Sequence, residues 1–228
     1  MTHSSDAALQ KETADWTARF YAAAVDLYPA SDPSHDILHI NRVVRMAEKL
    51  AKEEGADMMI VRPATWLHDC VNVPKDDPRR SQASRLSADY AIDWLGKAGY
   101  PAHYFEAIHH AIAAHSYSAA IPCETVEARV VQDADRLDGL GAVGIARCFT
   151  VGTLLSRPYY FDGDMLAHHR PLDDATQTID HFYVKLFKTA ETLQTPAGRA
   201  EGARRVAFMR QYLNEFAREA GEQPRDAA

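Results

Sequence analysis

The sequence lacks the features that mark several large classes of protein. Its 228 residues include only three cysteines, Cys70, Cys123 and Cys148, which are far apart and odd in number. This excludes a disulfide framework and is typical of reduced, buried thiols in a cytoplasmic protein. No apolar run approaches the ~20 residues of a membrane span, and the polar start of the chain lacks the apolar stretch of a signal peptide. We therefore expect a cytoplasmic protein with no membrane partner.

An excess of positive charge is also missing, because the formal net charge is −7. A general nucleic-acid binder usually carries a basic face, so we expect no nucleic-acid partner. An acidic protein still binds a phosphorylated small molecule where a few cations converge on one pocket. The alternation of apolar and polar residues that marks strands is absent too, as are internal repeats and low-complexity segments.

Helical periodicity runs along most of the chain instead. Apolar residues make up 46% of the sequence, which is enough for a real core, and the length fits a single domain over residues 1–228. We predict an all-α helical bundle of roughly eight to ten helices. The expected helices cover residues 9–28, 35–54, 57–71, 81–97, 102–115, 124–137, 143–155, 173–193 and 196–220.

The most informative residues are the adjacent pair His68 and Asp69, near the end of the apolar segment 58–71. An ionisable pair in such a segment is costly unless something satisfies it. A divalent metal does so, because a neutral imidazole and a carboxylate are both good ligands. Alone, the pair is a weak signal, since polar residues at helix ends are common.

Other histidines and aspartates strengthen this interpretation. Seven of the eleven histidines lie between residues 35 and 115. His35 and His39 are four residues apart and share a helix face, whereas His110 and His115 are five apart, roughly 140° around an ideal helix. Asp135 lies inside the otherwise apolar stretch 130–140 and is hard to explain as a surface residue.

Three motifs occur in a fixed order: HxxRV from His39, HD at residues 68–69, and ADRL at residues 134–137. This order resembles the H…HD…D signature of the HD-domain superfamily. Four longer segments are similar to one bacterial branch of HD phosphohydrolases. They are SHDxxHxxRV (34–43), HAIAAHSxS (110–118), QDADRLxxLGAxGIAR (132–147) and HRPLDD (169–174). The resemblance implies an HD-domain fold with a motif core at about 33–140 and C-terminal helices, 173–220, packed on it.

The resemblance also implies a metal site formed by His39, His68, Asp69 and Asp135. Such a metal polarises a phosphoryl oxygen and lowers the pKa of a bound water, so the implied reaction is hydrolysis of a phosphate bond. Asp69 is the implied catalytic residue, because it also orients the attacking water. His35, one turn before His39, is a candidate to support a ligand imidazole. The ligand types do not separate Mn, Fe, Ni, Co or Mg.

One position departs from the pattern. Some HD nucleotidases have an acidic residue three positions after the HD aspartate, where this chain has Asn72. An amide cannot act as a general base. Asp76 or Asp77 in the following loop is a candidate substitute, and a metal-activated water needs no further base.

The sequence offers several groups for a phosphate, each with a plainer alternative. Lys75 and Arg80 flank the loop after HD and are the first choice, against an ordinary solvated loop. His110 and His115 are candidates for phosphate or for a second metal, against hydrogen-bonded core histidines. Arg136 and Lys185 are further phosphate candidates, against structural ion pairs.

The leading hypothesis is a metal-dependent phosphohydrolase acting on a small phosphorylated molecule, with a nucleotide as the first choice. Cleavage of a nucleoside triphosphate to the monophosphate and pyrophosphate comes before phosphomonoester hydrolysis. Two alternatives stay open: a di-iron HD-type oxygenase, which needs extra histidine ligands, and a non-catalytic helical binding module. A homodimer is also left open.

Overall fold

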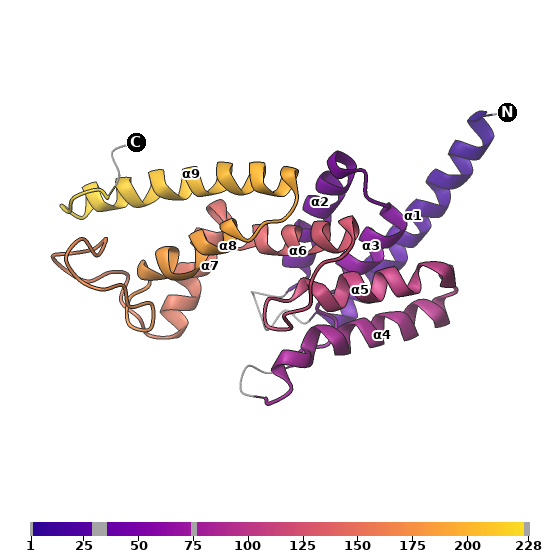
Figure 1. Ribbon diagram of the computed structural model, residues 1–228, viewed down its shortest axis with the longest axis horizontal. Helices are drawn as coiled ribbons and strands as arrows, with labels where there is room; N and C mark the ends of the chain where they lie inside the picture. Colours follow the sequence, from indigo (N-terminus) through magenta and orange to yellow (C-terminus); the bar gives the residue numbers. More distant parts are fainter. Residues whose placement is uncertain (1, 29–35, 74–76, 226–228) are drawn as a thin grey trace. The chain divides into compact units, whose positions relative to one another are not determined.

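The computed structural model describes residues 2–28, 36–73 and 77–225, with side chains from residue 15 onward. These residues form helices and no strand, which confirms the predicted all-α class (Figure 1). No single helix among them is long and apolar enough to cross a membrane; α6 and α7 pass that test only as a bent pair. The helices are α1 (Thr2–Leu27), α2 (Ile37–Glu54), α3 (Met58–Leu67), α4 (Ala83–Ala98), α5 (Phe105–His115), α6 (Val126–Asp138), α7 (Gly141–Leu154), α8 (Phe187–Glu191) and α9 (Pro196–Glu219).

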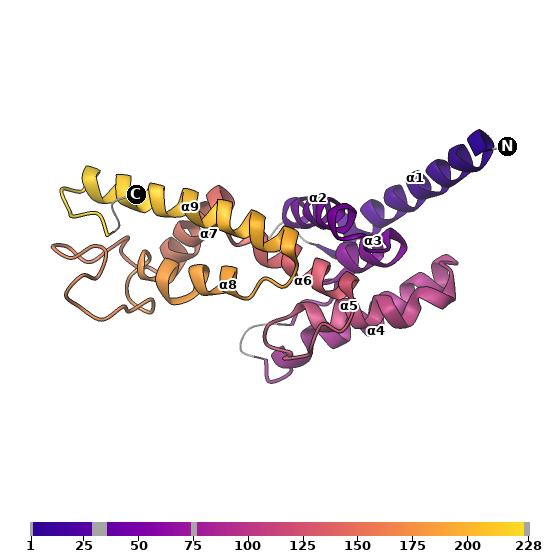
Figure 2. The ribbon, with the colours of Figure 1, turned by 45° about the horizontal axis from the view of Figure 1, so that its top comes forward.

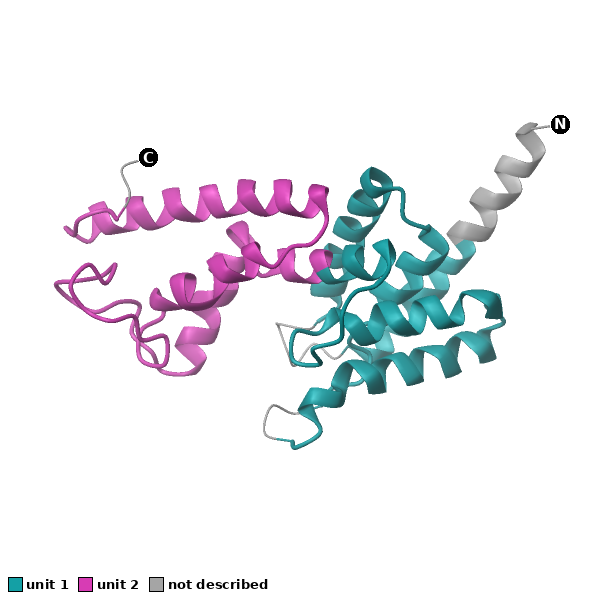
Figure 3. Ribbon diagram, viewed as in Figure 1, with its two compact units in different colours: residues 1–132 teal, residues 133–228 magenta. Residues whose placement is uncertain are grey.

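The chain forms two compact units, residues 1–132 and 133–228 (Figure 3). The boundary falls inside α6, so one continuous helix belongs partly to each unit. The expectation of a single domain, with the C-terminal helices packed on the motif core, stays a prediction.

Unit 1 is built on α2, α3, α4 and α5. Helix α3 packs against α2 and α5, and α4 runs along α5 (Figures 1 and 2). Helix α2 begins where the Asp36 carboxylate accepts a hydrogen bond from the His39 amide, and it ends at Gly55, whose φ of 70° favours glycine. Its buried residues recur at helical spacing from His39 to Ala51, so His39 lies on the core-facing side.

Helix α3 is shorter than the sequence predicts. It ends at Leu67, so His68 and Asp69 lie just beyond the helix instead of inside it. Pro63 lies within the helix and has no N–H to donate to the carbonyl of Met59, four residues earlier. The Tyr100 hydroxyl donates to that carbonyl instead, at 2.7 Å. A tertiary contact thus satisfies the group that proline leaves without a helical partner.

Unit 2 contains α7, α8 and α9, with α7 and α8 both packed against α9. The turn between α6 and α7 is tight: a Cβ at Gly144 would lie 2.2 Å from the Gly139 carbonyl oxygen, so only glycine fits there.

The predicted helix over 173–193 is wrong in its first half. Residues 173–179 form turns, and helical structure begins only just before the π-helical turn Phe182–Leu186, which leads into α8. The buried Asp180 carboxylate accepts hydrogen bonds from the Arg170 guanidinium, at 2.6 and 2.8 Å, and from the Asp173 amide, at 2.6 Å. These contacts wrap the preceding segment around Asp180 in turns.

All three cysteines are buried and none forms a disulfide, as the sequence predicts. Burial raises the pKa of Cys70 and of Cys148 to about 12, so neither is a reactive thiolate at neutral pH.

Candidate metal centre

The ring of His68 is held in one orientation by its own chain. It is completely buried, and its Nδ1 lies 2.7 Å from the carbonyl oxygen of Thr65. A carbonyl only accepts, so Nδ1 carries the hydrogen and donates it. In the neutral imidazole, Nε2 is then the atom with the lone pair, the form in which histidine binds a metal.

His115 repeats this arrangement at the end of α5. Its Nδ1 lies 2.6 Å from the Ile112 carbonyl oxygen, and the ring is 4% exposed. The rings of His68 and His115 meet edge to face, with centroids 4.9 Å apart. Each histidine therefore donates to the carbonyl three residues earlier and directs Nε2 away from it.

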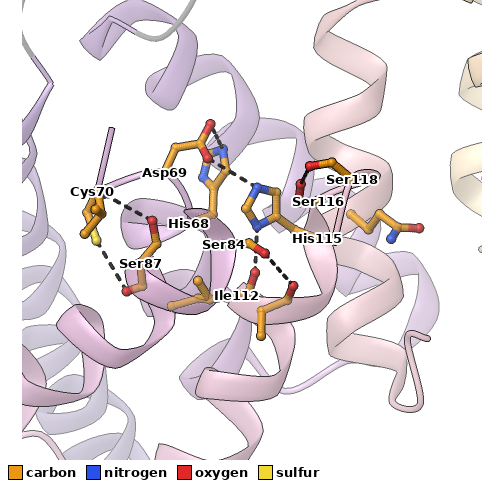
Figure 4. Close-up of polar contacts among 12 residues, drawn as sticks. His68, Asp69, Cys70, Ser84, Ser87, Ile112, His115, Ser116 and Ser118 are labelled. Atoms are coloured by element: carbon orange, nitrogen blue, oxygen red, sulfur yellow. Dashed lines mark hydrogen bonds and ion pairs between the residues drawn. The ribbon is translucent and has the colours of Figure 1, made fainter. Parts of the chain in front are cut away.

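Both Nε2 atoms face the carboxylate of Asp69 (Figure 4). His68 Nε2 lies 3.7 Å from Asp69 Oδ2, and His115 Nε2 lies 3.3 Å from Asp69 Oδ1. Two imidazole lone pairs and a carboxylate repel one another, so a cation among them, either a metal ion or a proton, is what stabilises the set. The Asp69 side chain is 29% exposed, so solvent reaches its carboxylate.

The ligand atoms of His68, Asp69 and His115 all lie within 4.8 Å of one another, close enough for one ion. A second group of the same size consists of His39, His68 and Asp135. His39 is buried on α2, and Asp135 is half-buried on α6. The two groups share His68. Because its one available Nε2 atom binds a single ion, the two groups are alternative sets of ligands around the same histidine.

Neighbouring elements fix the segment that carries His68 and Asp69. The Ser87 hydroxyl on α4 accepts from the Val71 amide at 3.1 Å, and the Cys70 thiol donates to the Ser87 carbonyl at 3.4 Å (Figure 4). On the other side, the buried Tyr28 hydroxyl donates to the Trp66 carbonyl at 2.9 Å. Burial, with Cys70 and Asp69 nearby, raises the pKa of Tyr28 well above its ordinary value, so Tyr28 stays a neutral donor.

The other predicted site residues lie elsewhere or have backbone partners. His35 and Lys75 lie outside the described residues. His110 Nε2 accepts from the Glu124 amide at 3.1 Å, and Arg80 donates to the Val73 carbonyl at 2.6 Å. Arg136 donates to the Thr192 carbonyl at 2.9 Å, and Lys185 is exposed in the π-helical turn before α8. None of them belongs to either donor group found among the described residues.

Sequence reasoning singled out Asp135 among the aspartates of α6 but missed what Asp133 does. Asp133 is fully buried, and its carboxylate accepts from the Thr195 amide and hydroxyl, both at 2.7 Å, and from the Gln194 amide. It thereby anchors the start of α9. Burial raises the pKa of Asp133, while these hydrogen bonds oppose the shift. The signal was present in the sequence: Asp133 and Asp135, two residues apart, lie on opposite sides of one helix.

A second missed residue is Gln132, which is buried and donates from Nε2 to the Ala114 carbonyl at 2.8 Å. A buried glutamine beside three aspartates in an apolar helix was a usable signal.

The chain is thus a helical bundle in which buried imidazoles and half-buried carboxylates lie close enough together to hold a metal ion, and comparison with known proteins places it among the HD-domain hydrolases. The family described as HD domain matches residues 37–140. The crystal structure of an HD-superfamily hydrolase from Bacillus thuringiensis is 30% identical, covers 93% of this chain and 99% of its own, and superposes with a TM-score of 0.70. The chain belongs to the HD superfamily.

A second relative is the uncharacterised protein YpgQ of Bacillus subtilis, 29% identical over 186 residues, which are 80% of this chain and 82% of YpgQ. The crystal structure of YpgQ in complex with ADP covers 89% of this chain and 96% of that chain, with a TM-score of 0.68.

Proposed function

We propose that this protein is a metal-dependent phosphohydrolase. The metal ligands in this proposal are His39, His68, Asp69 and Asp135, and His115 stands beside them. The observation that carries it is the pair of Nε2 atoms, of His68 and His115, that face Asp69 while both Nδ1 atoms are held by carbonyls. Imidazole and carboxylate donors suit a first-row divalent ion such as Mn, Fe, Ni or Co, or Mg.

A divalent ion bound there would polarise a phosphoryl oxygen and lower the pKa of a bound water. The protein's own residues position the reactants. The Thr65 and Ile112 carbonyls keep both imidazoles in the tautomer that leaves Nε2 free of hydrogen. The half-buried Asp69 reaches the solvent side and orients the attacking water.

Asn72, which stands where some HD nucleotidases have an acidic residue, is not the group that transfers the proton. Asn72 is exposed and carries an amide. The Arg79 guanidinium, hydrogen-bonded to Asp77, lowers the pKa of that carboxyl to about 2, which makes Asp77 a weak base. Asp76 lies outside the described residues. Among the carboxylates that the structure describes here, Asp69 is therefore the one that we assign to the water.

We propose a nucleotide as the substrate. Support comes from YpgQ, a relative whose crystal structure contains ADP. In the favoured reaction, water adds to the α-phosphorus of a nucleoside triphosphate. The bond from the α-phosphorus to the oxygen that bridges the α- and β-phosphates breaks, so that pyrophosphate leaves and the nucleoside monophosphate remains. Phosphomonoester hydrolysis, which releases inorganic phosphate directly, is the next choice.

The di-iron oxygenase has one observation in its favour, the third histidine, His115, beside His68 and Asp69. Iron content and oxygen uptake separate it from the phosphohydrolase. Hydrolysis by the manganese-loaded protein without oxygen would exclude an oxygenase as the main activity.

The test compares Asp69→Asn with Asp89→Asn in the full chain. Asp89 is a matched control because it also pairs with a histidine, His109, at 2.9 Å, but on the surface. Nucleoside triphosphates and phosphomonoesters are assayed with manganese, magnesium, nickel or cobalt, and phosphate is measured with and without added inorganic pyrophosphatase. We expect phosphate only with pyrophosphatase present. Asp69→Asn should lose about a hundredfold or more in rate, because the metal's contribution is several kcal/mol.

Asp89→Asn should keep the wild-type rate. Activity that persists in Asp69→Asn, or that is unaffected by a chelator, would contradict the proposal.

A further inference from the structure

The last turn of α5 has an unusual set of partners. The final carbonyls of a helix have no partner within the helix. Here three successive carbonyls each accept from a side chain. Ile112 accepts from His115 Nδ1 (Figure 4), Ala113 from the Ser84 hydroxyl at 2.9 Å, and Ala114 from Gln132. The end of α5, which carries His115, is therefore fixed from several sides.

Gln132 is placed to act on two candidate ligands at once. Its partner, Ala114, directly precedes His115 in the chain. On its own helix, Gln132 lies three residues before Asp135, close to one helical turn. One hydrogen bond of 2.8 Å thus joins α5 next to His115 and α6 one turn from Asp135.

We infer that Gln132 is a positioning residue of the metal centre, which sets the spacing between the end of α5 and the middle of α6. An amide suits this task because it donates without bringing a charge into a buried place. The position is 4% exposed, so no solvent molecule readily replaces the amide when it is removed. This inference rests on the proposed metal site.

The test is Gln132→Met, which keeps the length and most of the volume but removes the donor. The control is Tyr100→Phe, which also removes one side-chain hydrogen bond to a backbone carbonyl, that of Met59, away from the donor groups. For both variants and the wild type, the thermal midpoint is measured without metal, and Mn²⁺ affinity is measured by calorimetry well below that midpoint. The electron paramagnetic resonance spectrum of bound Mn²⁺ reports the symmetry of its ligands.

We expect both variants to lose thermal stability, but only Gln132→Met to bind Mn²⁺ about tenfold more weakly, with a changed spectrum. Should Gln132→Met fail to fold, Gln132→Asn, whose amide is one methylene too short to reach Ala114, takes its place with the same expectation. Wild-type affinity and spectrum in a folded Gln132 variant would overturn the inference and leave the proposed function intact. A wild-type protein that binds no divalent metal would instead overturn the proposed function.

Discussion

At the scale of single residues, three neighbouring polar side chains of α6, those of Gln132, Asp133 and Asp135, have different roles. Asp135 is one of a group, with His39 and His68, that could hold a metal ion. Gln132 donates to a carbonyl of α5, and Asp133 anchors the start of α9. Helical geometry explains the division, because side chains two residues apart point to opposite sides. The single sequence motif that begins at Gln132 therefore contains one candidate metal ligand, Asp135, and two structural residues, Gln132 and Asp133.

The substitution Asp133→Asn should cost the most stability among changes outside the two possible metal-binding groups. Asparagine has one acceptor oxygen, and its NH₂ would face the Thr195 and Gln194 N–H groups that now donate to the carboxylate. We expect the free energy of unfolding to fall by about 2–3 kcal/mol, because buried donors lose their partner. Chemical denaturation measures it.

The control for this change is Asp174→Asn. Asp174 is half-exposed and pairs with His181 at 2.9 Å, so its loss should cost less than about 1 kcal/mol. Equal losses in the two variants would contradict the anchoring role of Asp133.

At the scale of elements, the sequence predicts the existence of the helices better than their ends. The ends depend on partners far away in the chain, which periodicity does not reveal. Helix α3 stops at Leu67 while Tyr100 compensates for Pro63, and the segment before α8 turns around Asp180. The same limit applies to the site. The ordered motifs predict His39, His68 and Asp69 as ligands. The contacts of His115 with Asp69 and of His110 with the Glu124 amide depend instead on how α5 meets its neighbours.

Helix α9 contains a charge cluster with a pH dependence of defined sign. Two hydrogen bonds from Arg204 and one from Arg205 lower the pKa of Glu201 from 4.5 to about 2, and they outweigh the effect of burial, which raises it. A carboxyl whose pKa is lower in the folded state stabilises the fold above the unfolded pKa and loses that contribution as pH falls. The stabilisation is therefore present above pH 4.5 and declines towards pH 2.

Glu201→Gln should remove this dependence, so the difference in unfolding free energy between wild type and variant should shrink as pH falls through that window. Urea denaturation at several pH values measures it. Glu215→Gln is the control on the same helix, because Glu215 pairs with Arg218 in the solvent. A difference that stays constant with pH would show that Glu201 is not the group responsible.

At the scale of the whole molecule, the donors of the candidate centre come from segments far apart in the sequence. His39, His68 and His115 lie on or next to three different helices, and His68 comes close to each of the other two only in the folded chain. An unfolded chain has no such site, so a metal that binds these residues binds the folded state preferentially. Metal binding and folding are therefore coupled, whatever reaction the centre carries out.

This coupling predicts that Mn²⁺ raises the thermal midpoint of the protein. At a free concentration a hundredfold above Kd, binding adds about 2.7 kcal/mol to the free energy of unfolding. For a chain of this size that corresponds to a rise of about 5–10 °C, which a chelator should reverse. Differential scanning calorimetry measures the shift, and Asp89→Asn should show all of it. Asp69→Asn should show little, because that variant lacks the carboxylate that both imidazoles face. The same rise in Asp69→Asn as in the wild type would mean that the ion binds elsewhere on the protein.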